Sequence, residues 1–500
     1  MTAFADTADH SSDAIWRMPD GTFTEAPEGA IVSADGARIA PGTEGTPTFP
    51  APFVVNARDV ISVSLNLEAI RTEADEGADG QGGIVLTMLP KPSRTNYNPN
   101  AEHRQIAIVG SEAESIRYAF RAAGSHAEGE LILVPTLSYF GRTLELSGIT
   151  FVNHGPDADP AELTASTSSY AGQELDAAWR EKAAEKIDAH RKADLKIVVT
   201  DRYGDPIEGV DVAIEQLRHA YPFGTAIVSS RIVDAPREFS PESGMTTEQW
   251  LSDNARYREE ILNNFNTIVT ENDLKWPQWA YSNRTPGVYS QDWTQNAFDW
   301  FHQHEMTIKG HTLVWGSWRF TPFWLRELEE DPEAVHKAAL THIRDIAGAT
   351  ADRAGYWDVL NEPMSHRNLI ELLGMEKVAE WFKASREALP NTRLVMNEFD
   401  LVGNGGNPTR RANFIKFYEE LNELGAPLDV IGFQGHFWSD RFTAPVDVWA
   451  IIDEVHEATG LPVMISEFDS NVPNEQLQAD YTRDFLTAWF SHPATEAFIM

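Results

Sequence analysis

The 500-residue sequence contains no cysteine. This absence excludes disulfide bonds, thiolate metal sites and a cysteine nucleophile. No apolar run approaches the roughly 20 residues that a membrane-spanning helix needs, so we expect no membrane insertion. Basic residues are also scarce, because 40 Lys and Arg stand against 76 Asp and Glu, a formal net charge of −36. Such a chain repels phosphate backbones, and nucleic acid is not expected as a partner.

Signatures of the common metal and cofactor sites are missing as well. The 15 histidines include no HExxH pair, and His302 with His304 has a spacing that points to different faces of a helix. The patterns GxxxxGK[ST], GxGxxG and GxSxG do not occur, so neither a phosphate-cradling loop nor a serine nucleophile elbow is expected. We therefore predict no metal and no cofactor.

The first residues do not have the pattern of an export signal. Asp6, Asp9 and Asp13 stand where a signal peptide needs a basic segment followed by an apolar one. We expect either a chain that is not exported by that route or a version without its leader.

The length of the chain and the changes in its residue pattern predict several domains. We expect a poorly ordered tail over 1–29 and a β-sandwich over 30–158, where short apolar runs such as VISVSLNLEAI are separated by Gly, Pro, Asn and Asp. A stretch rich in Ala, Glu and Lys predicts a helical linker over 159–193. The runs LKIVVTD and VDVAIEQL on either side of RYGDPIEG predict a small β unit over 194–220.

Residues 221–500 alternate strand-like runs with longer helical stretches. The runs are FGTAI, FNTIVT, TIKGHTLVW, GYWDVLNE, TRLVMNE, LDVIGFQGH and LPVMISEFD, followed by EAFIM. Strands that alternate with helices form a parallel sheet, and seven or eight such units close a (β/α)8 TIM barrel of the α/β class. We expect the eighth strand to be cut at its end, at Met500.

Two glutamates stand at the ends of predicted barrel strands, Glu362 in WDVLNEP and Glu467 in VMISEFD. Active-site residues of such barrels lie at the C-terminal strand ends, so carboxylates after strands four and seven can converge across the mouth. A pair about 5 to 5.5 Å apart suits a retaining glycosidase, in which one carboxyl donates a proton and the other attacks the anomeric carbon. Either glutamate alone fits a solvated loop residue; the pair predicts a catalytic site.

The ordered motifs of this half resemble glycoside hydrolase family 10, the endo-1,4-β-xylanases and their relatives. The matching strings are YPFGTAI, TENDLKW, GHTLVWGS, WDVLNEP, LVMNEFD, IGFQGH and ISEFD. The resemblance implies that Glu362 is the acid/base and Glu467 the nucleophile. It implies substrate-binding or supporting roles for eight further residues: Glu271, Asn272, Lys275, His311, Trp315, Asn361, Gln434 and His436.

Two of these roles are specific. By the family pattern, Asn361 would donate to the 2-hydroxyl of the sugar at the cleavage point, and His436 would hydrogen-bond the nucleophile and favour its ionised form. The mixture of polar and aromatic side chains suits sugars, which present hydroxyls and an apolar face. Plain structural readings stay open for Lys275, as a surface ion pair, and for Trp315, as core packing.

The sequence also departs from the family pattern. The departures are Gly316, Ser317 and Trp318 in place of His-Ser-Gln, Pro363 in place of the commoner Ala, and Glu398 and Phe399 in place of Asp-Tyr. The tryptophans that follow strand eight in the family are not in this sequence. These changes leave the predicted mechanism in place and weaken the assignment of a substrate.

The leading hypothesis is a retaining hydrolase that cleaves internal β-1,4 linkages of a xylan-like polysaccharide. Two alternatives stay open: the same chemistry on another β-glycan such as mixed-linkage glucan, and a non-catalytic polysaccharide-binding protein. The N-terminal sandwich resembles the carbohydrate-binding modules that often precede such barrels. A polymeric substrate predicts an extracellular or cell-envelope location, and the oligomeric state is left open.

Overall fold

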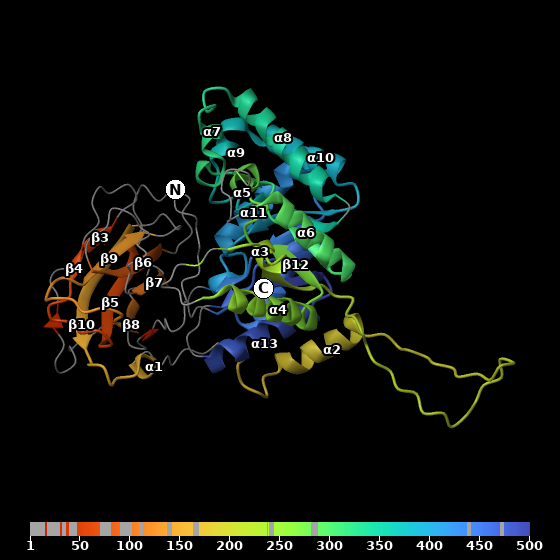
Figure 1. The fold of residues 1–500 in the computed structure, drawn as a ribbon, viewed down its shortest axis with the longest axis horizontal. Helices are drawn as coiled ribbons and strands as arrows, with labels where there is room; N and C mark the ends of the chain where they lie inside the picture. Colours follow the sequence, from red (N-terminus) through yellow and green to blue (C-terminus); the bar gives the residue numbers. More distant parts are fainter. Residues whose placement is uncertain are drawn as a thin grey trace.

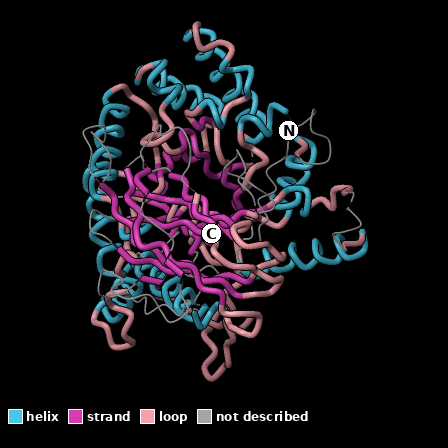
Figure 2. Tube along the Cα trace, turned by 90° about the vertical axis from the view of Figure 1, so that its left-hand side faces the viewer, coloured by secondary structure: helices cyan, strands magenta, loops and turns pink. Residues whose placement is uncertain are grey.

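The computed structural model describes residues 16–17, 31–32, 37–39, 48–70, 82–90, 103–109, 114–137, 143–163, 170–237, 239, 245–281, 289–351, 353–437, 442–470 and 475–500. Figure 1 shows a β-rich unit beside a larger barrel unit, with an extended arm on the far side of the barrel. In the view of Figure 2, strands lie toward the middle and helices lie around the rim.

Two antiparallel sheets form the N-terminal unit and confirm the predicted β-sandwich. The first has the order β1-β8-β5-β10-β2, with β3 also paired to β10, and the second has the order β4-β9-β6-β7. The inward residues of β5, such as Val63, Leu65 and Leu67, are fully buried in one hydrophobic core. The strands are β1 (Trp16–Arg17), β2 (Ile31–Val32), β3 (Ala37–Ile39), β4 (Phe49–Pro50), β5 (Val60–Ile70), β6 (Gly82–Leu89), β7 (His103–Val109), β8 (Glu114–Arg121), β9 (Ile132–Leu137) and β10 (Thr143–Asn153).

Part of the segment predicted as a tail belongs to the first sheet. Trp16 pairs with Arg117 and Arg17 with Ile116, so β1 is an antiparallel neighbour of β8. The other residues of 1–29 lie outside the described residues.

Eight parallel strand positions close the barrel in the C-terminal half. The order is β13-β12-β11-β21-β19-β17-β16-β15, β13 also pairs with β15 to complete the ring, and β14 extends the third position beside β15. The predicted TIM barrel is therefore confirmed. Its strands are β11 (Phe223–Ile227), β12 (Thr267–Thr270), β13 (Thr307–Gly310), β14 (Val314–Trp315), β15 (Ala354–Asn361), β16 (Arg393–Glu398), β17 (Val430–Phe433), β19 (Val463–Ile465) and β21 (Thr495–Ile499).

The predicted eighth strand is present in the barrel as β21 (Thr495–Ile499). Strand β21 pairs in parallel with β19 on one side and with β11 on the other, for example Phe498 with Ile465 and with Phe223. The EAFIM segment is thus long enough to close the ring, because each neighbour finds its hydrogen-bonding partner. A short parallel pair, β18 (His436–Phe437) and β20 (Asp469–Ser470), lies beyond the barrel strands.

Helices follow the barrel strands in the expected alternation, and their ends have local chemical causes. Thr246 accepts from the backbone N–H of Gln249 at the start of α4, Asp331 caps α8, and Gly460 ends α12 in the left-handed conformation. The helices of this half are α3 (Ser229–Ile232), α4 (Thr247–Asn264), α5 (Trp276–Tyr281), α6 (Gln291–Gln303), α7 (Phe323–Arg326), α8 (Pro332–Thr350), α9 (Asn368–Leu373), α10 (Met375–Ala388), α11 (Pro408–Glu423), α12 (Pro445–Thr459) and α13 (Glu475–Ser491).

The interior of the barrel is packed with side chains. One cluster of seven buried residues comes from six of the barrel strands, β12, β15, β16, β17, β19 and β21: Val269, Tyr356, Val395, Val430, Met464, Ala497 and Ile499. A larger cluster lies between the strands and the helices. A packed interior leaves the C-terminal strand ends as the place for a site.

The segment 194–220 does not form the small β unit that was predicted. It is an extended arm, visible in Figure 1, whose described pairing is a bridge between Thr200 and Pro206. The apolar residues that suggested strands are exposed, with 70% of Leu195 and 88% of Leu217 accessible. Alternating apolar residues make a strand only where another strand and a core receive them, and no such partner lies against this described segment.

The segment 159–193, predicted as a helical linker, contains α1 (Pro160–Leu163) and α2 (Trp179–Arg191). Helix α2 lies beside α13 of the barrel (Figure 1). Arg180 makes a bidentate ion pair with the fully buried Asp484 of α13, at 2.6 and 2.7 Å, and the Tyr170 hydroxyl donates to the same carboxylate at 2.7 Å. The helix is therefore attached to the barrel by a buried charge.

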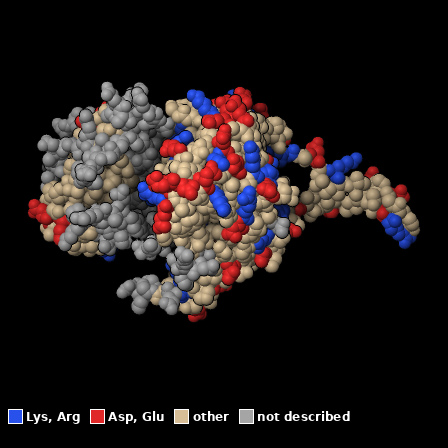
Figure 3. All heavy atoms as spheres, turned by 90° about the horizontal axis from the view of Figure 1, so that it is seen from above, with Lys and Arg blue, Asp and Glu red and all other residues tan. Residues whose placement is uncertain are grey.

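In the part of the chain that the structure describes, none of the helices combines the length and apolarity needed to cross a membrane. Figure 3 shows acidic and basic side chains interspersed over the barrel face seen from above. The net negative charge of the chain is thus not gathered into one patch on that face.

The attachment of α2 predicts a large effect of Asp484→Asn on stability. Burial opposes the charge of Asp484, but Arg180, Arg483 and Tyr170 reverse this effect and lower its pKa. Removing the charge leaves Arg180 without its partner, and we expect the free energy of unfolding to fall by about 3 kcal/mol. Because the folded pKa is lowered, this contribution is present above the ordinary pKa and is lost as the pH falls through the folded pKa.

Denaturant unfolding at pH 7 measures the change. The matched control is Asp188→Asn, because the pair of Asp188 with Lys192 is exposed on α2 and should change the free energy by about 0.5 kcal/mol or less. Equal effects of the two substitutions would contradict the attachment.

Candidate active site

Both predicted carboxylates lie at C-terminal ends of barrel strands. Glu362 follows β15 directly and is 9% exposed, and Glu467 lies two residues beyond β19 with 24% of its side chain accessible. The backbone of Glu362 is left-handed, with φ of 52°, and its N–H donates to the Asn397 carbonyl at 2.8 Å. The chain thus turns sharply where the strand ends.

A chain of side-chain amides joins the two carboxylates. Gln434 Nε2 donates to Glu362 Oε1 at 2.9 Å and approaches Asn361 Oδ1 at 3.4 Å. Asn397 Nδ2 donates to the same Asn361 oxygen at 2.9 Å and to Glu467 Oε1 at 2.6 Å. The three amides lie on three successive strand positions of the barrel, so the parallel register itself sets the relative position of the two glutamates.

Positive groups surround Glu467. His311 Nδ1 lies 3.6 Å from Glu467 Oε1, and His436 Nε2 lies 3.3 Å from Oε2. Burial would raise the pKa of Glu467, but His311, His436 and Lys309 together hold it well below its ordinary value. The carboxylate is therefore ionised across the physiological pH range.

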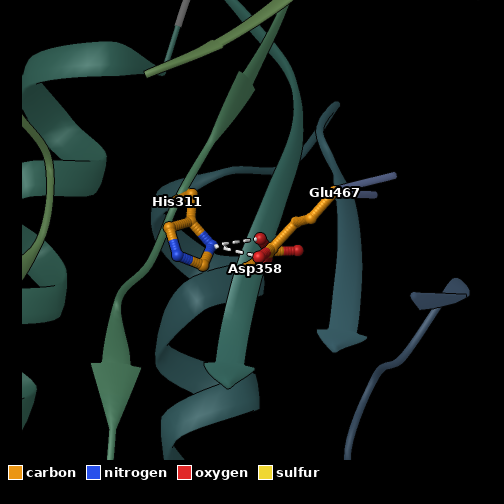
Figure 4. A group of neighbouring side chains, drawn as sticks. All are labelled: His311, Asp358 and Glu467. Carbon is orange, nitrogen blue, oxygen red and sulfur yellow. Dashed lines mark hydrogen bonds and ion pairs between the residues drawn. The ribbon is translucent and has the colours of Figure 1, made fainter. Parts of the chain in front are cut away.

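His311 also contacts Asp358, and Figure 4 shows both side chains beside Glu467. Potential ligand atoms of these three residues lie within 4.8 Å of one another. However, Asp358 Oδ2 already receives His311 Nδ1 at 2.7 Å and the buried ammonium of Lys309. A cation at this point would be repelled by that ammonium, so the group suits the charge balance of Glu467 better than metal binding.

His436 connects Glu467 with a second carboxylate. Its Nδ1 lies 2.9 Å from Asp469 Oδ1, and the pairing of β18 with β20 places His436 opposite Asp469. Burial lowers the pKa of His436, but the two carboxylates outweigh it and raise the pKa well above its ordinary value. His436 is thus held as a cation against Glu467.

The surroundings of Glu362 have a different character. Trp315 Nε1 donates to Glu362 Oε2 at 3.1 Å, and His366 Nε2 lies 2.9 Å from the same oxygen. With Gln434 on Oε1, both oxygens are held by nitrogen donors of the site. Glu362 is therefore fixed in orientation, without the cluster of cations that surrounds Glu467.

Glu398 lies buried behind the turn that follows Glu362. It accepts from the Met364 backbone N–H at 2.9 Å and from Arg410 Nη1 at 2.9 Å. Burial raises the pKa of Glu398 to about 8, an effect that Arg410 opposes and the charge of Glu362 reinforces. The residue at which this sequence departs from the Asp-Tyr pattern thus supports the turn that follows Glu362.

The residues predicted on strands two and three lie along one side of the site. Lys275 Nζ donates to Asn272 Oδ1 at 2.8 Å and lies 5.4 Å above the ring of Trp315. Burial lowers the pKa of Lys275, and Glu467, Glu271 and Glu362 oppose that shift. Glu271 itself is exposed at the end of β12. Lys275 therefore lies beside Trp315 within the site, and its described contacts are not those of a surface ion pair.

Several residues of this site were missed in the sequence. Asn397 stands before Glu398 as Asn361 stands before Glu362, and this repeated Asn-Glu pair at two strand ends was a usable signal. Asp469 follows Glu467 by two residues in the quoted motif ISEFD. His366 had no such signal, because its position depends on the left-handed turn at Glu362.

The arrangement can perform a reaction that needs two carboxylates with different tasks. The carboxylate of Glu467 is ionised beside cations, and the carboxyl group of Glu362 is oriented by N–H donors, so the two groups differ in their surroundings as such a reaction requires. The structure brings together all of the predicted residues, with Glu271 at the exposed margin.

The chain is similar to several known proteins over part of its length. Over 327 residues the chain is 28% identical to anti-sigma-I factor RsgI6 of Acetivibrio thermocellus, covering 64% of this chain and 38% of that protein. Over 315 residues it is 23% identical to endo-1,4-beta-xylanase 1 of Arabidopsis thaliana, covering 63% and 30%. The chain spans between 27% and 52% of the length of four of these curated relatives.

Among solved structures, the native xylanase 10B of Thermotoga maritima aligns with 22% identity and a TM-score of 0.45, over 56% of this chain and 82% of that one. The family model described as glycosyl hydrolase family 10 matches residues 235–500. Since this match covers more than half of the sequence and includes both carboxylates, the chain belongs to glycosyl hydrolase family 10.

Proposed function

We propose that this chain is a retaining glycoside hydrolase that cleaves internal β-1,4 linkages of a xylan-like polysaccharide. The single observation that carries the proposal is the contrast between the two carboxylates: cations hold Glu467 ionised, and neutral N–H donors orient Glu362. Distant relatives named endo-1,4-beta-xylanase support the choice of polymer.

In the proposed first step, Glu362 gives its proton to the glycosidic oxygen while Glu467 attacks the anomeric carbon and forms a glycosyl-enzyme. In the second step, water attacks the same carbon, Glu362 takes the water proton, and Glu467 leaves. Asn361 Nδ2 is buried and has no hydrogen-bond partner among the described residues, so it is available to donate to a sugar hydroxyl close to Glu467. The outcome is hydrolysis with retention.

A second candidate is a non-catalytic polysaccharide-binding protein. The relative named as an anti-sigma-I factor favours it, because that name describes no hydrolase. A binding role would not require an ionised nucleophile and an oriented proton donor in the same cleft. The ordered pair therefore favours the enzyme, and measurement of activity decides between them.

We extend the proposal to the N-terminal sandwich and to the location of the protein. Its N-terminal sandwich would bind glycan as a carbohydrate-binding module, and a polymeric substrate would place the protein outside the cytoplasm or in the cell envelope. Both statements rest on the proposed substrate.

Replacement of the nucleophile tests the reaction. We expect the unsubstituted chain to release reducing sugars from xylan faster than from mixed-linkage β-glucan, and Glu467→Ala to abolish the release because no glycosyl-enzyme can form. The exposed His302→Ala is the control and should leave the rate unchanged. Undiminished activity of Glu467→Ala would contradict the assignment of Glu467 as the nucleophile. A faster rate on the glucan would change the proposed polymer. If the unsubstituted chain cleaves neither polysaccharide, the binding protein is favoured.

Replacement of the proton donor should give a different pattern. Glu362→Ala should lose roughly 10²- to 10⁴-fold on substrates with poor leaving groups, the usual contribution of general acid catalysis. Aryl glycosides with an activated leaving group need no proton, so their first step should be affected far less. Initial rates on a phenyl and a dinitrophenyl β-xylobioside measure this difference. Equal losses on both would contradict the acid role.

The cations around Glu467 predict a pH effect. The folded pKa of Glu467 is lowered, so kcat/KM should fall only when the pH drops well below the ordinary carboxyl range. His436→Ala removes one cause of the lowering and should move the acidic limb of the kcat/KM profile upward by about 1 pH unit or more. His436→Gln keeps a donor without a charge and should move it as well. An acidic limb that stays in place in both variants would contradict the electrostatic role.

A further inference from the structure

We infer that His366 is a positioning residue for proton donation by Glu362. Its imidazole stabilises the Glu362 carboxylate as the proton leaves. Because Trp315 Nε1 and His366 Nε2 both lie at Glu362 Oε2, the transferred proton belongs to the other oxygen, Glu362 Oε1. This inference rests on the proposed function and deepens it. His366 lies outside the strings that match the family, since WDVLNEP ends at Pro363.

A tight turn places the imidazole. Glu362 has the left-handed φ of 52°, and its carbonyl accepts the backbone N–H groups of Ser365 at 3.2 Å and His366 at 3.0 Å. The chain therefore folds back on itself within four residues. As a result, His366 Nε2 comes to 2.9 Å from Glu362 Oε2, and both side chains are 12% exposed.

The turn is held from below by the buried side chains of Arg410 and Glu398. Arg410 Nη1 donates to Ser365 Oγ at 3.1 Å and to Glu398 Oε1 at 2.9 Å. The second oxygen of Glu398 accepts the Met364 N–H at 2.9 Å. Two consecutive residues of the turn are thus tied to the same buried pair, which limits the freedom of the imidazole.

Gly316 makes room for this turn from above. A Cβ atom on Gly316 would lie 2.5 Å from the His366 carbonyl oxygen, too close for any side chain. The Gly316 carbonyl in turn accepts the Leu369 N–H at 2.9 Å. The glycine that stands where the family usually has histidine is therefore what allows a different histidine, from the following loop, to reach the acid/base.

Two aromatic rings set the plane of the imidazole. The ring of Phe320 meets His366 edge-on, at 4.9 Å and 90°, and the ring of Trp315 does so at 5.6 Å and 81°. Phe320 and Trp315 are themselves stacked at 3.6 Å. These two ring contacts thus fix the plane in which the imidazole nitrogen meets Glu362.

The hydrogen-bond pattern distinguishes the two oxygens of Glu362. Oε2 faces Trp315 Nε1 and His366 Nε2, and Oε1 faces only Gln434 Nε2 among the described contacts. When the C–O bond of the sugar breaks, the proton moves from Oε1 to the leaving oxygen and the carboxylate charge spreads to Oε2. Two N–H donors already point there, so the charge forms in a prepared environment.

The test compares leaving groups. We expect His366→Ala to lower kcat/KM on phenyl β-xylobioside by roughly 10-fold or more, the factor that one hydrogen bond to a charged group is worth. On dinitrophenyl β-xylobioside, whose leaving group needs no proton, the loss should stay below about twofold. His366→Gln retains an N–H donor and should recover most of the loss, and His302→Ala, on an exposed helix surface, should show none.

Gly316→Ala provides a second route to the same result if His366→Ala does not fold. It displaces the turn without removing the imidazole and should also slow the phenyl substrate more than the dinitrophenyl substrate. Equal losses on both substrates, or no loss on either, would overturn the role of His366. Cleavage of neither substrate by the unsubstituted chain would overturn the proposed function as well. If Glu362→Ala shows the leaving-group dependence and His366→Ala does not, only this inference fails.

Discussion

The site depends on keeping the carboxylate of Glu467 charged inside the protein. Burial by itself favours the neutral acid, because a carboxylate loses its hydration there. His311, His436 and the buried ammonium of Lys309 reverse that preference. Lys309 and His311 share the carboxylate of Asp358, and His436 pairs with Asp469, so the groups that stabilise the charge of Glu467 have carboxylate partners in addition to it.

The barrel could be predicted because the hydrophobic runs of parallel strands and the helices between them have a distinct period. The eighth strand is a five-residue run that gives little pattern by itself, because its pairing with β11 and β19 depends on residues far away in sequence. The small β unit predicted over 194–220 does not form. The alternation of this segment is that of a paired strand, but pairing is a property of two segments, and a single segment cannot reveal whether its partner exists.

The site was predictable to the extent that its residues end barrel strands. Glu362, Glu467, Asn361 and Gln434 all follow buried runs, and the fold brings such positions together whatever the loops do. His366 belongs to a loop, and its contact with Glu362 requires a left-handed backbone, a glycine opposite and the buried Arg410–Glu398 hydrogen bond below. Contacts that need several independent local conditions leave no simple spacing in the sequence.

The attachment of α2 to α13 also bears on how the chain reaches its folded state. Arg180 and Tyr170 meet Asp484 across sequence separations of 304 and 314 residues. During synthesis, α2 leaves the ribosome long before its docking surface exists, while the sandwich can complete its sheets from neighbouring strands. Contacts between residues so far apart in sequence form late and slowly during folding. Helix α2 can therefore take its place against the barrel only after α13 has been made.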